Sequence, residues 1–516
     1  MLKRIVSPPI ATRGLVAAAS AIGVAALALI IATGMFGSTQ GAQAGTTQTY
    51  LVLYKQQAVP ADAASAIQRA GGTLVYSYDA IGVAIAQSAS TSFRDKVLSD
   101  KKVEGVSSTA GFGVKFEDDL GAAEGPPPGD LPNSPASDTD NLSYLQWDMR
   151  QIHAPEAHAI TGGSPSIVVG DIDTGLDWTH PDLAPNVDFS KSVSCVTGAP
   201  DQNPDAWMDR AGHGTHTAGT IAAADNGIGI VGVAPRVKIA GIKAGNDDGY
   251  FFPEAVVCAF MWAATHDIDV TNNSYFADPW LFNCRNDAEQ RAIWKAEQRA
   301  IRYAMQQGVV VVASNGNENQ DLAKQNIDEI SPDFPPGSET TREVTNACVR
   351  IPVEIPGVIG VSANGNLLQK SFYSDYGVGA TQVVAPGGDS LFQLTAEAPN
   401  GRVLSTWPAV VPVNDLPPSR IVMDGGARYG YLQGTSMAGP HVAGVAALVM
   451  SQFGKMPQGA VQAMMTSTAD PMACPANPFN PGPPFIFEAT CTGGPSYNSF
   501  FGHGQVNALS AVTHSP

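Results

Sequence analysis

Two kinds of apolar segment alternate along the chain from Ser166 onward, and this alternation limits the possible folds. Short runs rich in β-branched residues, such as SIVVGDID and GVVVVAS, are flanked by glycine, proline or asparagine. Between them lie longer segments with helical periodicity, such as EAVVCAFMWAATH. Continuous apolar strands separated by helices predict a mostly parallel sheet that helices cover on both faces. We therefore expect an α/β fold of three layers.

Three short motifs carry residues suited to nucleophilic catalysis. Asp173 lies in DIDTGLDWTHPDL, His213 in GHGTHTAG and Ser436 in GTSMAGPHVAG. A serine hydroxyl is a weak nucleophile until a base takes its proton, and imidazole titrates close enough to neutrality to do so. A buried carboxylate can then orient the imidazole and stabilise its charged form. Asp173 follows a predicted strand, and the carboxyl ends of parallel strands are where sites form.

The order of these motifs resembles that of the subtilisin-like serine peptidases, the subtilases. In that family aspartate precedes histidine and histidine precedes serine, an order that differs from other folds with the same triad. The similarity runs from about Tyr144 to the segment FGHGQVNALSAV near Val512. It implies a subtilisin-like fold and a secreted endopeptidase that forms an acyl-enzyme intermediate on Ser436. Asp171 is a weaker candidate for the acid, because it lacks the Thr174-Gly175 neighbours of the family motif.

The resemblance also implies the residues that stabilise the oxyanion. GVVVVASNGNEN resembles the family's strand followed by a Gly-Asn pair, which makes Asn317 the side-chain donor to the tetrahedral intermediate. Asn315 is the alternative. The backbone N–H of Ser436 would be the second donor. His216 and His441 lie in the same motifs and are expected to be structural.

The substrate-binding segments match the family less well. Ser274, Tyr275 and Gly316 are the predicted substrate-binding residues, but the glycines that follow the serine in the family are replaced here by aromatic and small residues. An insertion from Glu318 to about Arg350 follows the second segment. The side-chain preference therefore does not follow from the sequence.

A structural calcium ion is implied by the loop after the histidine motif, where AADNGIGIVG aligns with the family's calcium loop without a gap. The ligands would be oxygens, which suit Ca²⁺. They are the Asp182 and Asn226 side chains and the backbone carbonyls of Ala224, Ile228 and Ile230. Alternatively, Asp182 caps a turn and Asn226-Gly227 is only a turn signal. No organic cofactor is expected.

Residues 1–44 have the features of an export signal. Lys3 and Arg4 precede an apolar run from Leu15 to Phe36, and Ala42-Gln43-Ala44 offers the small residues of a cleavage site. We expect cleavage after Ala44 and a secreted protein. Because the run is long enough to span a bilayer, an uncleaved membrane anchor is the alternative.

The strand-like and helix-like segments of residues 45–116 predict a small α+β domain with elements in the order β-α-β-β-α-β. The acidic, proline-rich residues 117–143 cannot bury much apolar surface and predict an exposed linker. By resemblance, residues 45–116 are a propeptide that acts as chaperone and inhibitor, and residues 144–516 are the catalytic domain. Maturation would fall between Val114 and Ser143. A domain that stays in the mature protein is the alternative.

Charge and cysteine content narrow the possible partners. The formal net charge of −18 opposes nucleic-acid binding, which requires basic surfaces. Resemblance to the subtilases implies protein or peptide substrates, and we expect a monomer. An even number of cysteines in an exported protein favours disulfides, but their connectivity is open except for a local pair, Cys474 with Cys491. The six cysteines are Cys195, Cys258, Cys284, Cys348, Cys474 and Cys491.

Two other functions would share this fold. One is an inactive relative that only binds peptides. The other is a transpeptidase or cyclase, in which an amine rather than water resolves the acyl-enzyme. The complete set of Asp173, His213, Ser436 and Asn317 favours the peptidase.

Overall fold

The computed structural model describes residues 46–109, 138–276, 280–332, 339–410, 412, 415–483 and 486–514. These residues belong to the unit formed by residues 45–516. The predicted export signal, the end of the predicted propeptide and most of the predicted linker lie outside the described residues. Within them, no helix is both long enough and apolar enough to cross a membrane.

The N-terminal domain has a four-stranded antiparallel sheet in the order β2-β3-β1-β4. Its elements are β1 (Gln48–Tyr54), α1 (Ala63–Ala70), β2 (Thr73–Tyr78), η1 (Asp79–Ile81), β3 (Val83–Ser88), α2 (Phe93–Leu98) and β4 (Val103–Ser108). The helices pack on one face of the sheet through Ile67 and Phe93. The strands and α-helices follow one another in the order that the sequence predicts.

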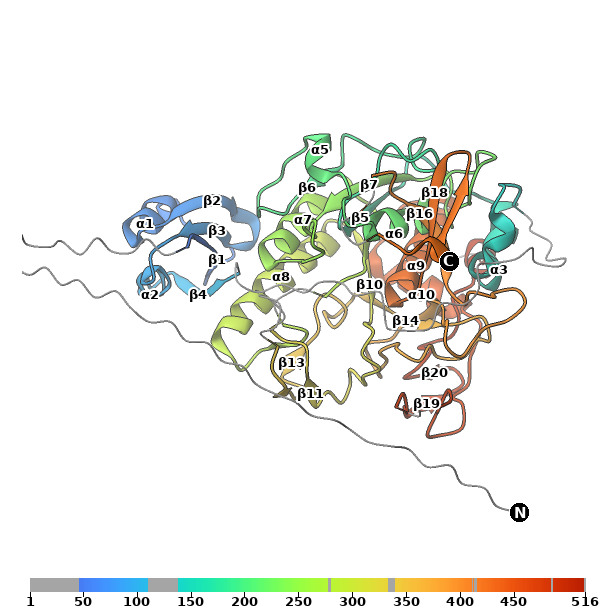
Figure 1. Cartoon of the computed structure of the whole chain (residues 1–516). Coiled ribbons are helices and arrows are strands. Elements are labelled where there is room, and N and C mark those ends of the chain that lie inside the picture. The colour runs from blue at the N-terminus through green and yellow to red at the C-terminus, as the bar shows by residue number, and fades with distance from the viewer. Residues whose placement is uncertain are drawn as a thin grey trace, which may run out of the picture. The chain divides into compact units, whose positions relative to one another are not determined.

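A seven-stranded parallel sheet forms the centre of the larger domain (Figure 1). In spatial order its strands are β15 (Val383–Pro386), β14 (Ile359–Asn364), β10 (Val310–Ser314), β8 (Val270–Asn273), β5 (Val168–Asp173), β7 (Lys238–Lys243) and β6 (Val193–Ser194). All of these strands run the same way, so their carboxyl ends meet at one edge. Asp173, the last residue of β5, lies at that edge.

Helices cover both faces of the sheet, which confirms the predicted three-layer α/β architecture (Figure 1). One face carries α7 (Pro253–Thr265) and α8 (Ala288–Gln306). The other face carries α6 (His213–Ala222), α9 (Thr435–Phe453) and α10 (Gln458–Thr468). Successive strand residues point to opposite faces, so Val311 packs with the first group and Val312 with the second.

Smaller elements surround this core. An antiparallel sheet contains β16 (Val403–Trp407), β17 (Ile421–Asp424) and β18 (Ala427–Leu432). Short helices are η2 (Ser143–Leu145), α3 (Trp147–Gln151), α4 (Ala154–His158), α5 (Pro204–Trp207), η3 (Pro418–Arg420) and α11 (Ala508–Thr513). Two-residue strands pair as β9 (Asn283–Cys284) with β13 (Cys348–Val349), β11 (Ile327–Asp328) with β12 (Arg342–Glu343), and β19 (Gly493–Gly494) with β20 (Tyr497–Asn498).

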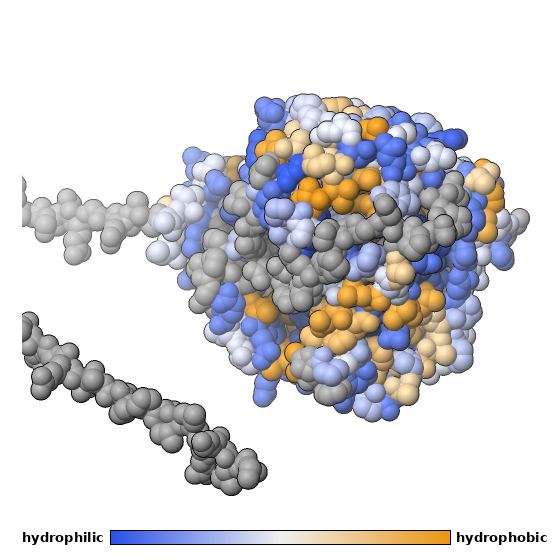
Figure 2. Space-filling view, turned by 45° about the vertical axis from the view of Figure 1, so that its right-hand side comes forward, coloured by the Kyte–Doolittle hydropathy of each residue, from blue (hydrophilic) through white to orange (hydrophobic). Residues whose placement is uncertain are grey.

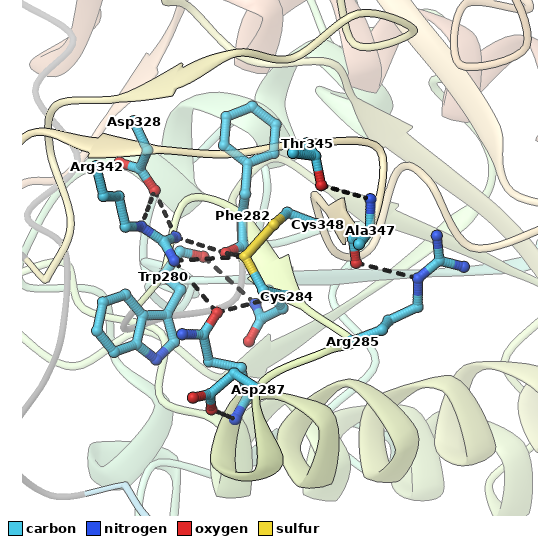
Figure 3. The surroundings of a disulfide bond; sticks show 12 residues. Trp280, Phe282, Cys284, Arg285, Asp287, Asp328, Arg342, Thr345, Ala347 and Cys348 are labelled. Atoms are coloured by element: carbon cyan, nitrogen blue, oxygen red, sulfur yellow. Dashed lines mark hydrogen bonds and ion pairs between the residues drawn. A yellow bond between two sulfur atoms is a disulfide. The ribbon is translucent and has the colours of Figure 1, made fainter.

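Disulfides join all six cysteines as Cys195–Cys258, Cys284–Cys348 and Cys474–Cys491. The last pair confirms the local prediction. The second ties the end of the inserted segment to the segment before α8 (Figure 3). Beside it, the Arg342 guanidinium donates to Asp328 at 2.6 Å and lies 4.6 Å from the centre of the Trp280 ring. The disulfide and the contact of Arg342 with Trp280 thus hold the insertion against the domain, whereas the Arg342–Asp328 pair lies within the insertion.

Some apolar side chains remain on the surface. Figure 2 shows hydrophobic residues at several places on one face of the molecule, among hydrophilic ones. Exposed examples are Ile160, Phe189 and Met423. Exposed apolar residues are normal on a folded protein and carry no functional conclusion by themselves.

Candidate active site

The fold brings Asp173 and His213 together at the carboxyl edge of the central sheet. His213 is the first residue of α6, and its Nδ1 lies 2.7 Å from Oδ1 of Asp173. The Asp173 side chain is fully buried and that of His213 is nearly so. The N–H of Thr174 donates to the same carboxylate oxygen at 2.7 Å. A carboxylate only accepts hydrogen bonds, so Nδ1 of His213 carries a proton and Nε2 is left to act as a base.

A buried aspartate outside the three motifs holds the turn that presents His213. Asp209 accepts hydrogen bonds from the N–H groups of Ala211 and Gly212 at 2.9 Å. It also accepts the N–H and the hydroxyl of Thr215 at 2.8 and 2.6 Å. None of the three sequence motifs contains this residue. Its position shortly before the first turn of α6 resembles that of a helix-capping side chain, which is the signal that could have revealed it.

Ser436 lies in the first turn of α9, close to the positive end of the helix dipole. Its Oγ donates to the carbonyl of Ser274 at 3.2 Å, and the Ser274 hydroxyl donates to the Ser436 carbonyl at 3.1 Å. These two bonds cross-connect α9 and the end of β8. They fix the backbone that carries Ser436 against one predicted wall of the substrate cleft.

Asn317 is held beside Ser436 in a single orientation. Its Oδ1 accepts hydrogen bonds from the N–H and the hydroxyl of Thr435 at 2.9 and 3.0 Å. Because Oδ1 is occupied, the Nδ2 group of the amide is the side that can donate to a ligand. Asn315 is fully buried instead, and its Nδ2 donates to Thr381 at 2.8 Å.

Gly316 occupies a conformation that requires glycine. Its φ is +120°, and a Cβ would overlap the guanidinium of Arg350. Arg350 is buried and donates to the Asn315 carbonyl at 2.9 Å and to Glu318 at 2.8 Å. It also pairs with the buried Asp375. The end of the insertion therefore lies directly behind the loop that carries Asn317.

The predicted substrate-binding Tyr275 turns its side chain away from solvent. Its ring stacks on Phe251 with 4.4 Å between ring centres, and its hydroxyl donates to Asn273 at 3.0 Å. Only 5% of the residue is exposed. A role of Tyr275 in substrate binding would therefore fall to its backbone.

The two other histidines of the motifs have structural contacts. Burial lowers the pKa of His216 to about 3, so this residue is neutral, and its Nε2 lies 3.0 Å from the Gly430 carbonyl. His441 is fully buried between the Met437 carbonyl at 2.7 Å and Asp148 at 3.0 Å. Both sets of contacts agree with the structural roles expected for these residues.

The buried Asp182, a predicted calcium ligand, contacts the loop that contains the other predicted ligands. Its Oδ2 accepts hydrogen bonds from Tyr429 at 2.9 Å and from the Ile230 N–H at 3.1 Å, whereas its Oδ1 has no hydrogen-bond partner in the described part of the chain. Burial raises the pKa of the Asp182 carboxyl to about 7. A buried carboxylate oxygen without a partner is unfavourable, and a cation would satisfy it.

The loop itself is compatible with a cation held mainly by backbone carbonyls. The N–H groups of Asn226 and Gly227 donate to Asp140 at 3.1 and 2.8 Å, which shapes the loop. Asn226 Oδ1 accepts the Ile228 N–H at 3.1 Å, so its amide also serves the turn. Among the described residues, no three His, Cys, Asp or Glu side chains gather as a metal cluster. The predicted calcium ligands would not form such a cluster, because Asp182 is the one carboxylate among them and the others are an amide and backbone carbonyls.

A buried Asp-His pair, a serine in the first turn of a helix and an oriented asparagine, all at one edge of a parallel sheet, define the class of α/β serine peptidases. Residues 164–504 match the model of the Subtilase family. The chain belongs to this family, and its larger domain is a subtilisin-like serine peptidase domain.

Two characterised relatives illustrate the similarity. The chain is 30% identical to fervidolysin of Fervidobacterium pennivorans over 348 residues, which cover 65% of the chain and 42% of fervidolysin. It is 28% identical to subtilisin E of Bacillus subtilis over 325 residues, which cover 63% of the chain and 66% of subtilisin E. The chain thus spans less than half of fervidolysin and just under two thirds of subtilisin E.

The fold of this chain is also similar to that of a relative whose structure has been solved. The crystal structure of fervidolysin, described as a keratinolytic enzyme related to subtilisin, matches 91% of this chain with a TM-score of 0.63. The match covers 61% of fervidolysin at 24% identity. Residues 138–516 make up 379 of 516 residues, about 73%, so the structural match extends into the N-terminal domain.

Proposed function

We propose that this protein is a secreted endopeptidase that hydrolyses peptide bonds through Asp173, His213 and Ser436. The observation that carries the proposal is the 2.7 Å contact between Asp173 and His213 at the sheet edge where α9 presents Ser436. The export signal of residues 1–44 would direct secretion. Three disulfides support an oxidising destination.

The proposed reaction begins when the Ser436 hydroxyl turns from the Ser274 carbonyl toward Nε2 of His213. His213 takes the proton as Ser436 attacks the scissile carbonyl, and Asp173 stabilises the imidazolium that forms. Nδ2 of Asn317 and the N–H of Ser436 would donate to the oxyanion. His213 then protonates the leaving amine, which leaves an acyl-enzyme. Water activated by the same histidine releases the second product.

An active-site titration tests this function directly. The purified protein is treated with a fluorophosphonate probe, and the modified peptide is identified by mass spectrometry. Labelling at Ser436 together with hydrolysed peptide products supports the peptidase. Labelling with joined or cyclised products would indicate a transferase, and absence of labelling would indicate a peptide-binding relative.

Residues 45–116 are proposed to be a propeptide that inhibits the enzyme until it is removed. The domain packs on α7 and α8, where Leu51, Leu53 and Ile85 join the apolar cluster of the larger domain. Arg299 of α8 donates to the Tyr54 carbonyl at 2.9 Å and to Glu104 at 3.1 Å. These contacts support a domain that stabilises the two helices as the larger domain folds.

Cleavage is proposed to occur between Val114 and Asp138. Asp138 lies 3.1 Å from Nδ1 of His158, and Asp140 accepts hydrogen bonds from the N–H groups of Asn226 and Gly227. Because these two aspartates contact the larger domain, the mature chain would keep them.

The propeptide is expected to dissociate more readily as the pH rises. Glu254, in the first turn of α7, is 4% exposed, and its Oε2 has no hydrogen-bond partner among the residues described. Burial raises the pKa of Glu254 from 4.5 to about 7, and burial also raises the pKa of the adjacent Glu297 well above its usual range. Thr109 of the propeptide partly offsets this rise in the pKa of Glu254. Departure of the propeptide would expose Glu254 and return its pKa toward 4.5.

Proton linkage fixes the direction in which the affinity for the propeptide changes with pH. Below about pH 4.5 Glu254 is protonated in both states, and the affinity does not change with pH. Between about pH 4.5 and 7 the complex keeps the proton while the free enzyme loses it, so the affinity falls as the pH rises. Above about pH 7 Glu254 is ionised in both states, so the affinity no longer changes with pH. Because α7 itself provides part of the burial, the pKa of Glu254 would not return fully to 4.5 in the free enzyme. We therefore expect the affinity for the propeptide to fall about tenfold to a hundredfold between pH 5 and pH 7.5.

Size-exclusion chromatography of the processed complex at each pH measures the fraction of propeptide that stays bound. Glu254→Gln is the matched variant, because glutamine has the same size and does not ionise. It should flatten the pH dependence of release without changing that of peptide hydrolysis. Equal pH dependences of release in both proteins would contradict the role of Glu254.

Calcium is proposed to bind at Asp182, Asn226 and the carbonyls of Ala224, Ile228 and Ile230. A bound ion would supply positive charge to the unpartnered Oδ1 of Asp182 and cross-connect the loop to the turn that carries Asp182. Removal of the ion with EGTA is expected to lower Tm by roughly 5 °C, since a ligand at about 100 times its Kd adds about 2.7 kcal/mol. Differential scanning calorimetry with and without EGTA measures the change. Asp182→Asn should have a lower Tm that EGTA no longer alters, whereas a wild-type Tm insensitive to EGTA would refute the site.

A further inference from the structure

Asp171 is a second buried carboxyl group next to the proposed catalytic pair, and the mechanism above does not use it. It lies two residues before Asp173 on β5, so both side chains extend from the same face of the strand. The two residues are 1% and 0% exposed. Asp173 contacts His213, whereas the oxygens of Asp171 lie 2.7 Å from Oγ1 of Thr217 and 2.8 Å from Nδ2 of Asn272.

These two contacts lead to the backbone around His213 and Ser436. Thr217 follows His213 by one helical turn in α6, and its Oγ1 lies 3.1 Å from the Gly214 carbonyl and 3.4 Å from the His213 carbonyl. Asn272 Nδ2 is also 3.1 Å from Oγ of Ser274, which donates to the Ser436 carbonyl. Asp171 therefore connects the first turn of α6 to the strand end that supports Ser436.

The hydrogen-bond pattern around Asp171 suits a neutral carboxylic acid. Nδ2 of Asn272 can only donate, so the oxygen that faces it accepts. Thr217 has one hydroxyl proton but faces two acceptors, an oxygen of a charged Asp171 at 2.7 Å and the Gly214 carbonyl at 3.1 Å, so it can donate to only one of them. If Asp171 is protonated, it donates to Oγ1 of Thr217, which then donates to the Gly214 carbonyl. One donor and one acceptor on Asp171 then satisfy both neighbours.

The electrostatic surroundings favour the same form. The titratable groups that face Asp171 are Asp173 from its own strand and His213 from α6. The neighbouring elements add the neutral Thr217 from α6 and Asn272 from β8, and Gly241 of β7 pairs with Asp171 in the sheet. Burial, together with the charge of Asp173, raises the pKa of Asp171 well above its usual range.

We propose that Asp171 is a positioning residue that acts as a neutral carboxylic acid, holding Thr217 and Asn272 in place while Asp173 alone carries the negative charge that faces His213. The inference rests on the proposed catalytic roles of Asp173, His213 and Ser436. A second negative charge would stabilise the imidazolium before the reaction begins. At neutral pH fewer enzyme molecules would then have His213 in the unprotonated form that can act as a base.

Two substitutions at Asp171 distinguish a neutral acid from a charged one. The pH profile of kcat/KM is measured per active site counted with the fluorophosphonate probe. Asp171→Asn keeps the size and supplies one donating and one accepting side, so kcat/KM should stay within about threefold of wild type. The acid limb of the profile, which reports protonation of His213, should not move. Asp171→Ala should lower kcat/KM by about tenfold or more, since it leaves two buried polar groups without their partner.

Opposite results would overturn the proposal. If Asp171 were charged, Asp171→Asn would remove that charge and shift the acid limb to lower pH by about one unit. An Asp171→Asn enzyme as impaired as Asp171→Ala would exclude the neutral acid as well. A wild-type protein that fails to react with the probe would instead refute the proposed function, which separates the two failures.

A second variant separates positioning from simple loss of folding. Thr217→Val keeps the shape of the side chain and removes the hydroxyl that contacts Asp171. If the two residues act through one contact, the double variant Asp171→Ala, Thr217→Val should be no worse than Asp171→Ala alone. Fully additive losses in kcat/KM would show that the contact is not the cause.

Discussion

Replacement of Ser436 by alanine is expected to abolish both peptide hydrolysis and removal of the propeptide. The variant keeps the Asp173–His213 pair but lacks the atom that attacks the scissile carbonyl. We expect kcat to fall by about 10⁶-fold, the loss that removal of the nucleophile causes in subtilisin. Intact mass and N-terminal sequencing of both secreted products measure the processing. The wild type should begin between Val114 and Asp138, whereas the variant should retain residues 45–116.

Ser467→Ala is a suitable control, because this serine lies on α10 and its hydroxyl donates within the same helix to the Met464 carbonyl at 3.1 Å. It should be processed like the wild type. If Ser436→Ala is trimmed at the same position, another protease performs the maturation. Retention of peptidase activity by Ser436→Ala would contradict the proposed nucleophile.

The sequence predicts the part of the site that depends on regular strands and short motifs. The run that ends in Asp173 is continuous and apolar, so its place in a parallel sheet and the position of its last residue both follow from the pattern. His213 is the first residue of α6 and Ser436 the second residue of α9, and a glycine precedes each helix, which the motifs show directly. The pair Cys474–Cys491 could be predicted because only 17 residues separate its members.

Contacts between distant segments could not be predicted in the same way. Asp209 supports the turn of His213 through hydrogen bonds whose geometry exists only after folding. Arg350 reaches Gly316 because the insertion folds back, and no periodic pattern specifies that path. The members of Cys195–Cys258 and Cys284–Cys348 are separated by 63 and 64 residues, so their pairing depends on the tertiary structure.

Tyr275 shows the limit of alignment with a family motif. The resemblance predicts that its backbone contacts the substrate, but the direction of a side chain depends on the local strand geometry and on its neighbours. Here the neighbouring Phe251 offers a flat ring, and the two rings lie nearly parallel at 4°. The aromatic residue thus adds to the hydrophobic core.

Asn317→Ala is expected to lower kcat by about 10² to 10³-fold, the usual effect of removing one side-chain donor from an oxyanion hole. Oδ1 of Asn317 is fixed by the N–H and hydroxyl of Thr435, and this leaves Nδ2 in place before the substrate arrives. A donor that is already oriented needs no rearrangement as charge develops on the carbonyl oxygen. The bond strengthens in the transition state, so KM should change little.

Asn315→Ala is the matched comparison for this prediction, because it removes the same amide two residues earlier. Asn315 donates to Thr381 at 2.8 Å within the core, so its loss should lower Tm and leave kcat per titrated active site nearly unchanged. Steady-state kinetics and thermal unfolding of both variants separate the two roles. If Asn317→Ala kept a normal kcat while Asn315→Ala lost it, the oxyanion donor would be Asn315, and the orientation imposed by Thr435 would serve only the packing of α9.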